Sequence, residues 1–182
     1  LGYLSRMNSA LGLDKLVEAF IELKKIQGLE NLKLRATGGL VGEDRKCVSN
    51  LRKKLAGLGL ENDAEFIEDF SRGHRLDFLK SLSVMCVPVE RGEAFGTYIV
   101  EAMAVGVPVV QPHAGAFPEI IEATGGGLIY ADVVETLREV LTNPDLARRL
   151  GRQGREAVHE SFSVEAMARN MSSVYREILQ ND

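Results

Sequence analysis

The sequence is poor in the residue types on which metal sites and disulfide-bonded folds depend. Its 182 residues include two cysteines, three histidines and no tryptophan. Neither Cys47 nor Cys86 has a second cysteine or a histidine nearby at the spacing of metal ligands, so we expect two buried structural thiols. His74, His113 and His159 are too dispersed along the chain to indicate a metal site or a catalytic triad. We therefore expect no metal ion.

Long hydrophobic runs and blocks of like charge are missing too. No apolar run approaches the ~20 residues that a membrane-spanning helix needs, and the first residues lack the basic-then-apolar pattern of a secretory signal. The 22 lysines and arginines are spread over the chain and nearly balance the 26 acidic residues, for a net charge of −4. This balance argues against a nucleic-acid-binding surface. We expect a cytoplasmic chain with no membrane span and no nucleic-acid partner, and we leave peripheral membrane association open.

Two nucleotide-binding fingerprints are also absent. The segment Gly38–Gly42 has the wrong spacing for Gly-x-Gly-x-x-Gly, and the glycines at 125–127 precede an expected strand instead of opening a helix. No Walker lysine loop occurs. These absences argue against a nicotinamide-dependent dehydrogenase and against a P-loop ATPase.

The sequence does contain a regular alternation of apolar patterns. Short apolar segments typical of strands alternate with stripes at helical spacing, such as Leu13 to Leu23 and Cys47 to Leu58. Alternation of this kind predicts an α/β fold, a Rossmann-like parallel sheet flanked by helices. We expect strands at residues 1–4, 32–37, 64–67, 84–88, 107–110 and 128–130, and helices at 13–26, 47–58, 74–81, 97–105 and 117–123.

Length and composition predict one domain. A chain of 182 residues that is 45% hydrophobic can bury a core of its own. We expect a single domain over residues 1–182, with a sheet core to about residue 130 and a helical part over about 131–182. In that part Asn143-Pro144 and Phe162-Ser163 are expected helix starts, with Phe162 packing on Met167. An apolar stripe through the last helix predicts that this helix packs on its own domain.

The most informative segment lies between residues 84 and 110. An apolar strand that ends at Pro88 is followed by a glycine-containing loop and then by a helix that we expect to begin near Thr97. Glu93 lies in the loop and Glu101 on the second turn of the helix, so both carboxylates can reach one pocket at the helix N-terminus. Helix N-termini attract anions, and ligands of open α/β sheets bind at the carboxyl ends of the strands. The pair favours a ligand with both hydroxyl and phosphate groups, such as a nucleotide sugar.

This segment and the residues after it resemble a known family. The similarity is carried by Pro88, Glu93, Phe95-Gly96, Glu101–Ala104, Gly106, Pro108–Val110, Gly115 and Pro118-Glu119. Looser, colinear similarities at residues 2–6, 38–39 and 162–163 extend it over almost the whole chain. The chain resembles the retaining glycosyltransferases of family 4, which have the two-domain GT-B architecture. The resemblance is to their C-terminal, donor-binding domain and implies that the acceptor-binding half is absent from this sequence.

The resemblance implies a role for each end of the donor. Glu101 would accept hydrogen bonds from the ribose hydroxyls, and the backbone near residues 67–70 would meet the base. Glu93 would face the donor sugar, bind its hydroxyls and stabilise positive charge at the anomeric carbon. No cofactor is implied, because the nucleotide-diphosphate sugar is itself the substrate.

Other implied contacts come from the main chain and from one arginine. N–H groups at the junction of loop and helix would meet the sugar or the phosphates, and a second glycine would form another wall of the sugar pocket. Arg6 would clamp the diphosphate and offset the charge of the leaving group, so Arg6 and Glu93 are the expected catalytic residues. The expected donor contacts are Arg6, Glu101, Gly115 and the main chain of Ala94, Phe95, Gly96 and Thr97.

One departure from the family concerns the diphosphate. Where the family carries a lysine before a glycine, this chain has Leu11 before Gly12, and a leucine supplies no charge. Lys15 lies one helical turn away and would substitute only if the helix extended back far enough. A solvated lysine on the helix surface is the simpler interpretation.

The expected function is that of a donor-binding domain of a retaining glycosyltransferase, inactive as an isolated fragment. The whole enzyme would move a sugar from a nucleotide-diphosphate sugar to an acceptor hydroxyl. A degenerate nucleotide-binding or interaction module, motivated by Leu11, and a GT-B nucleotide-sugar epimerase are the alternatives. In the resembled family the C-terminal helix often crosses back to the other domain, which would leave part of its apolar stripe uncovered here.

Overall fold

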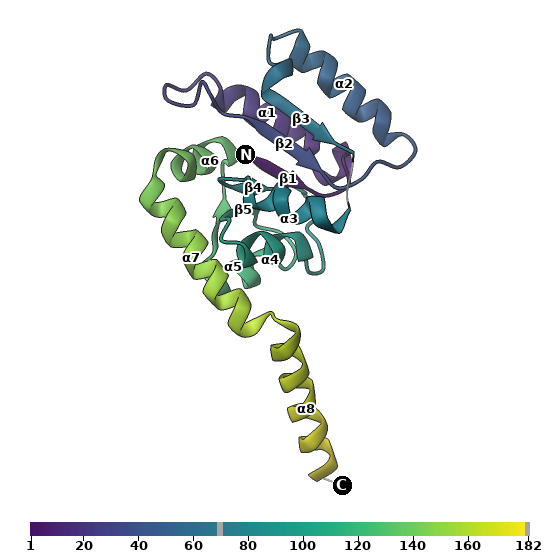
Figure 1. Ribbon diagram of the computed structural model, residues 1–182, viewed down its shortest axis with the longest axis vertical. Helices are drawn as coiled ribbons and strands as arrows, with labels where there is room; N and C mark the ends of the chain where they lie inside the picture. The colour runs from purple at the N-terminus through teal and green to yellow at the C-terminus, as the bar shows by residue number, and fades with distance from the viewer. Residues whose placement is uncertain (69–70, 181–182) are drawn as a thin grey trace.

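A six-stranded parallel sheet forms the centre of the computed structural model, which describes residues 1–68 and 71–180 (Figure 1). The strand order is β3-β2-β1-β4-β5-β6. Neighbouring strands are parallel, with Tyr3 opposite Ala36 and Cys86 opposite Val110. The strands are β1 (Gly2–Leu4), β2 (Leu34–Thr37), β3 (Ala64–Ile67), β4 (Met85–Cys86), β5 (Val109–Pro112) and β6 (Gly127–Tyr130).

The expected α/β fold is confirmed, although of the expected strands only 64–67 has the bounds found in the structure, and β4 and β5 differ in an informative way. β4 is limited to Met85 and Cys86, because Pro88 has no N–H to donate and the N–H of Val89 turns back to the carbonyl of Val87 at 2.8 Å. β5 begins at Val109 and not at Val107, because the Val107 N–H donates to the carbonyl of Ala102 and closes the preceding helix. Strand periodicity alone does not reveal either competing bond.

Helices connect the strands and cover both faces of the sheet (Figure 1). Right-handed crossovers place α1 and α2 on one face and α4 and α5 on the other. α6 contacts α1, and α7 contacts both α4 and α5. The helices are α1 (Leu13–Leu23), α2 (Asp44–Ala56), α3 (Arg72–Lys80), α4 (Thr97–Ala104), α5 (Phe117–Thr124), α6 (Val133–Thr142), α7 (Pro144–Ser161) and α8 (Val164–Gln180), with single 3-10 turns at Ser9–Leu11 and Glu61–Asp63.

The expected starts of the last two helices are confirmed. The Asn143 side chain accepts a hydrogen bond from the N–H of Leu146 at 3.0 Å, with proline at the first position of α7. The Ser163 hydroxyl accepts one from the N–H of Ala166 at 3.1 Å. Phe162, however, lies beside Phe95, with ring centroids 6.3 Å apart, and Met167 is 62% exposed. The expected packing of Phe162 on Met167 is therefore wrong.

The last helix, α8, extends away from the rest of the chain (Figure 1). Ala166 is its only buried residue, and its apolar side chains are largely exposed, up to 76% at Leu179. The expectation that this stripe packs on its own domain is wrong, because helical periodicity predicts a helix but not the surface that covers it. Within the described residues, no helix is both long and apolar enough to cross a lipid bilayer.

Two glycines let α7 pack closely against the start of β6. A Cβ atom added to Gly154 on α7 would lie 2.8 Å from the Cα of Gly126 and 3.1 Å from Cγ of Met103 on α4. A side chain at Gly154 would therefore push α7 away from both neighbours. This contact fixes α4, which carries Glu101, against the C-terminal helices.

Gly154→Ala should destabilise the fold, although alanine is ordinarily the better helix former by ~0.5–1 kcal/mol. Overpacking of the contact with Gly126 should lower the free energy of unfolding by about 1–3 kcal/mol. Gly73→Ala on α3 is the matched control, because its added Cβ would meet no described atom within 4 Å, and it should be slightly stabilising. Urea unfolding followed by circular dichroism measures both, and equal stability of the two variants would contradict the close packing.

Candidate functional site

The strand order reverses between β1 and β4, and this reversal opens a crevice at their carboxyl ends. From β1 the chain proceeds through α1 toward one edge of the sheet, and from β4 it proceeds through α4 toward the other edge. Loops that leave neighbouring strands in opposite directions part from each other, and ligands of such sheets bind between them. The loop after β1 carries Arg6 and Leu11, and the loop after β4 carries Glu93.

The Glu93 loop is held by the turn that follows β5. Gly92 and Gly115 both have left-handed backbone conformations, with φ of 66° and 53°. A Cβ atom on Gly92 would lie 2.4 Å from the Gly115 nitrogen, and one on Gly115 would lie 2.4 Å from the Glu93 carbonyl oxygen. The N–H of Ala116 donates to that carbonyl at 3.1 Å. The structure therefore brings Gly115 and Glu93 together, with no room for side chains at either glycine.

Helix α4 begins at Thr97, where the sequence predicts it. Gly96 precedes it in a left-handed conformation with φ of 72°, and a Cβ there would lie 2.7 Å from the Phe117 ring. The first hydrogen bond of the helix runs from the N–H of Ile99 to the carbonyl of Gly96 at 3.0 Å. N–H groups ahead of this bond have no partner within the helix. The exposed residues Ala94, Phe95 and Thr97 border this end of the helix.

Glu101 lies on the second turn of α4 and is only partly exposed. One carboxylate oxygen, Oε1, lies 3.2 Å from Nη1 of Arg75 on α3. The other oxygen, Oε2, is buried and receives no hydrogen bond from the described residues. Nothing in the spacing of the sequence links Arg75 to Glu101, because the two helices are joined only through the fold.

Tyr98, on the first turn of α4, is a second residue that the sequence does not single out. Its side chain is 8% exposed and its ring lies 6.3 Å from that of Phe117. Burial raises the pKa of the Tyr98 hydroxyl, and the nearby charge of Glu93 raises it further. The hydroxyl nevertheless makes no hydrogen bond of standard geometry within the described part of the chain. The Tyr98 hydroxyl is thus buried close to the Glu93 carboxylate.

Arg6 lies two residues beyond β1 and is bound by a carboxylate. Its Nε donates to Oδ2 of Asp44 at 2.6 Å and its Nη2 to Oδ1 at 3.1 Å. Asp44 also accepts from the side chain of Asn8 and from the N–H of Val41. Hydrogen bonding to Arg6 lowers the pKa of Asp44 to about 2. The guanidinium remains half exposed, but its charge is compensated.

Leu11 and Lys15 face different surroundings. Leu11 is partly buried against the core, and its carbonyl accepts a hydrogen bond from the hydroxyl of Tyr3 at 3.2 Å. Lys15, on the first turn of α1, pairs through its Nζ with Oε1 of Glu90 in the loop after β4. A cation is therefore present near Leu11, from a different position in the sequence.

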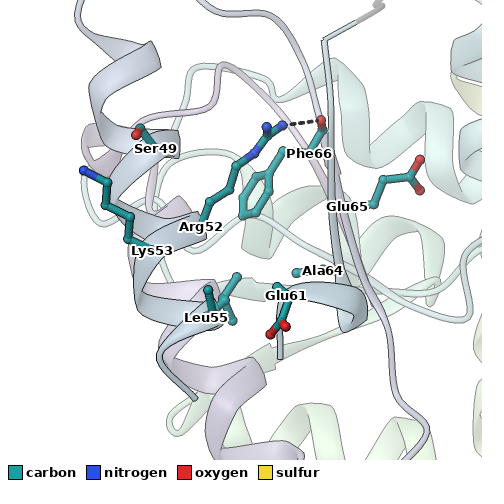
Figure 2. A pocket seen from close by; sticks show the side chains of 9 residues that line it. Ser49, Arg52, Lys53, Leu55, Glu61, Ala64, Glu65 and Phe66 are labelled. Carbon is teal, nitrogen blue, oxygen red and sulfur yellow. Dashed lines mark hydrogen bonds between the residues drawn. The ribbon is translucent and has the colours of Figure 1, made fainter. Parts of the chain in front are cut away.

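Two further hollows lie toward the β3 edge of the sheet. One, of about 280 Å³, is lined by Thr37, Ile67, His74 and Arg75 at the ends of β2 and β3 and along α3. It adjoins the expected base-binding segment 67–70, of which Asp69 and Phe70 lie outside the described residues. The other, of about 560 Å³, lies between α2 and β3, where Arg52 donates to the carbonyl of Phe66 at 3.2 Å (Figure 2).

The groove of Figure 2 contains none of the residues expected to bind the donor.

Across residues 1–68 and 71–180, no three histidine, cysteine, aspartate or glutamate side chains gather as a metal site would require. The expectation of two buried thiols is confirmed for Cys86, whose pKa is raised by burial, and is wrong for Cys47, which is only partly buried and has its sulfur 3.4 Å from the Ser9 hydroxyl.

Comparison with known sequences identifies the family. The profile described as glycosyl transferases group 1 matches residues 1–157. The chain belongs to this family. A protein from Mycolicibacterium hassiacum, named MMP alpha-(1->4)-mannosyltransferase, is 35% identical over 70% of the chain. The lipopolysaccharide core mannosyltransferase LpsB of Rhizobium meliloti is 27% identical over 98% of it.

These relatives are longer than the chain, which spans 32% of the first and 52% of the second. Solved glycosyltransferase structures share its fold. The C-terminal domain of LpcC from Francisella tularensis has a TM-score of 0.76 at 21% identity and covers 90% of this chain and 85% of its own. Anabaena HepE, solved with UDP and glucose, has a TM-score of 0.82 at 19% identity, covering 97% and 47%. The Rossmann-like half of a GT-B fold expected from the sequence is confirmed.

The ion pair between Arg6 and Asp44 predicts how the stability of this glycosyltransferase chain depends on pH. The pKa of Asp44 is about 2 in the folded chain and ~3.9 when unfolded. Because the folded pKa is the lower one, the pair stabilises the fold above about pH 4, and this contribution is lost as the pH falls toward 2. Asp44→Asn should therefore lower the melting temperature at pH 7 by several degrees and flatten its decline between pH 4 and pH 2.

Thermal melting followed by circular dichroism at pH 7, 4 and 2 measures this effect. Asp145→Asn is the control, because Asp145 forms an exposed ion pair within α7, with a side chain 90% exposed. Indistinguishable melting of the two variants at pH 7 would show that Asp44 contributes no more than a surface charge.

Proposed function

We propose that the chain is the donor-binding domain of a retaining glycosyltransferase, which moves a sugar from a nucleotide-diphosphate sugar to an acceptor hydroxyl. One observation carries the proposal. Glu93 lies in the loop that leads from β4 to the N-terminus of α4, Glu101 lies on the second turn of that helix, and β4 borders the point where the strand order reverses. That arrangement suits a ligand with hydroxyl groups at both ends and phosphates between them.

Glu101 would bind the ribose. Its Oε2 is buried without a hydrogen bond from the described residues, and a buried acceptor of this kind gains most from a ligand that donates to it. Arg75 would hold the carboxylate in place through Oε1, 3.2 Å away. The hollow of about 280 Å³ that Arg75 also lines would accept the base.

Glu93 would act at the donor sugar. Its carboxylate would bind sugar hydroxyls and stabilise the positive charge that develops at the anomeric carbon as the leaving group departs. Gly115, packed against the Glu93 main chain, would form the opposite wall of the sugar pocket. Retention of configuration is carried over from the family and is part of the proposal.

The diphosphate would be met by main-chain donors and by Arg6. N–H groups at the Ala94–Thr97 junction approach an anion without an intervening side chain, since Gly96 precedes the helix. The half-exposed guanidinium of Arg6 keeps donors that Asp44 does not occupy. The reaction so described uses no metal ion or other cofactor, because these donors offset the charge of the leaving diphosphate.

One observation favours a second candidate, a binding module that has lost efficient transfer. Leu11 is apolar and packed against the core, and Arg6 has its charge compensated by Asp44. Fewer uncompensated cations at the diphosphate would slow departure of the leaving group. This candidate shares donor binding with the first and differs in the rate of transfer.

We propose that another part of the protein binds the acceptor. The chain spans about a third of the M. hassiacum relative, at 32%. We take the partner to be an acceptor-binding half of the same protein, and expect transfer only when both halves are present.

Donor binding is tested by calorimetric titration of the chain with UDP, GDP and ADP. We expect saturable binding of at least one of them, and we expect Glu101→Ala to weaken it about tenfold to hundredfold, through loss of charge-assisted hydrogen bonds to the ribose. Glu122→Ala, an exposed glutamate on the neighbouring helix α5, is the matched control and should bind normally. Absence of saturation at millimolar concentration, or equal affinity of the two variants, would refute the proposed site.

A further inference from the structure

A hollow of about 350 Å³ lies at the point where the strand order reverses. Its lining comes from the loops that follow β1 and β4, at residues 9, 10 and 12 on one side and 88, 90 and 91 on the other, with Lys15 from α1. The two loops touch where Gly12, with φ of 80°, packs on the main chain of Pro88. The hollow thus belongs to the crevice and lies within the loops that carry Arg6 and Glu93.

Two cations line this hollow, and neither was assigned to the donor above. Lys15 and Arg91 contribute positive charge from opposite sides of the hollow. Leu11 supplies no charge, and Arg6 is committed to Asp44 by two hydrogen bonds. Lys15, on the first turn of α1, therefore differs from Arg6 in that its carboxylate partner is not buried.

The present partner of Lys15 is a surface residue. Lys15 Nζ pairs with Glu90 Oε1, and the Glu90 side chain is 77% exposed, against 5% for Asp44 in the pair with Arg6. Hydrogen bonding to Lys15 lowers the pKa of Glu90, so this carboxylate is charged and competes with other anions for the lysine. Exposed ion pairs contribute little stability, so a ligand with more negative charge displaces Glu90 readily.

On the basis of the donor-binding function proposed above, we propose that Lys15 binds the diphosphate of the donor and that Glu90 occupies the lysine in the unliganded chain. Lys15 then supplies, from the first turn of α1, the charge that Leu11 lacks. When the donor enters, the diphosphate replaces the carboxylate at Nζ and Glu90 turns toward solvent. Lys15 should therefore strengthen the binding of the diphosphate, and Glu90 should weaken it.

The test compares nucleoside diphosphates with their nucleosides. UDP, GDP and ADP, and then uridine, guanosine and adenosine, are titrated into the 182-residue chain and its variants by calorimetry or, for weak binding, by NMR. Lys15→Met keeps the aliphatic stem and should weaken diphosphate binding about tenfold to hundredfold while leaving nucleoside binding unchanged. Glu90→Gln should strengthen diphosphate binding about twofold to fivefold, since it removes the competing charge.

Lys25→Met is the matched control, because Lys25 lies just beyond the other end of α1 in an exposed pair with Glu22 at 2.7 Å. It should change neither affinity. If the chain binds a diphosphate in a Glu101-dependent manner and Lys15→Met binds it equally well, this inference falls and the proposed function stands. If the unaltered chain binds none of the three diphosphates, both fall. Equal loss of nucleoside and diphosphate binding in Lys15→Met would also overturn the assignment, since it would show a general disturbance of the fold.

Discussion

The reversal of strand order between β1 and β4 is the constraint on which the site depends. Parallel strands require crossovers of one hand, so the chain can leave two neighbouring strands in opposite directions only at one place in this sheet. The loops that carry Arg6 and Glu93 meet at that place, next to Lys15 on the first turn of α1. Close backbone contacts at Gly12, Gly92 and Gly115 then hold the loops together, since a side chain at any of them would collide with main-chain atoms.

Ion pairs at the crevice differ in how firmly they are held. Arg6 is bound to Asp44, whose side chain is 5% exposed and accepts further hydrogen bonds. Lys15 is bound to Glu90, whose side chain is mostly exposed. Arg75 and Glu101 are intermediate, with side chains 33% and 36% exposed. A charged donor would exchange most easily with the exposed pair. Arg6 would therefore meet a donor from a fixed position, whereas Lys15 would exchange its present partner for the donor.

Much of the fold could be predicted from the sequence, because its signals are local. Apolar periodicity indicates the strands and helices, Gly96 and Thr97 mark the start of α4, and Asn143 and Ser163 cap the helices where expected. The positions of Glu93 in the loop after β4 and of Glu101 on α4 also follow from the local order of strand, loop and helix. These features need no knowledge of distant contacts.

The pairings across the fold could not be predicted in this way. Asp44 is 38 residues from Arg6, Glu90 is 75 residues from Lys15, and Arg75 reaches Glu101 from another helix. Charged residues are common enough that spacing does not select such partners. The exposure of α8 does not follow from its periodicity for a related reason, since an apolar stripe shows that a helix has a face to cover but not which surface covers it. An uncovered part of the stripe was expected only from the family resemblance.

The central claim, that the donor occupies the N-terminus of α4, is tested most directly by mapping amide NMR shifts as a nucleoside diphosphate is added to isotope-labelled chain. We predict that the largest changes fall on Gly96, Thr97 and Glu101, with further changes in the loop between β1 and α1. Largest changes in the groove between α2 and β3, around Arg52, or along α8, would contradict it.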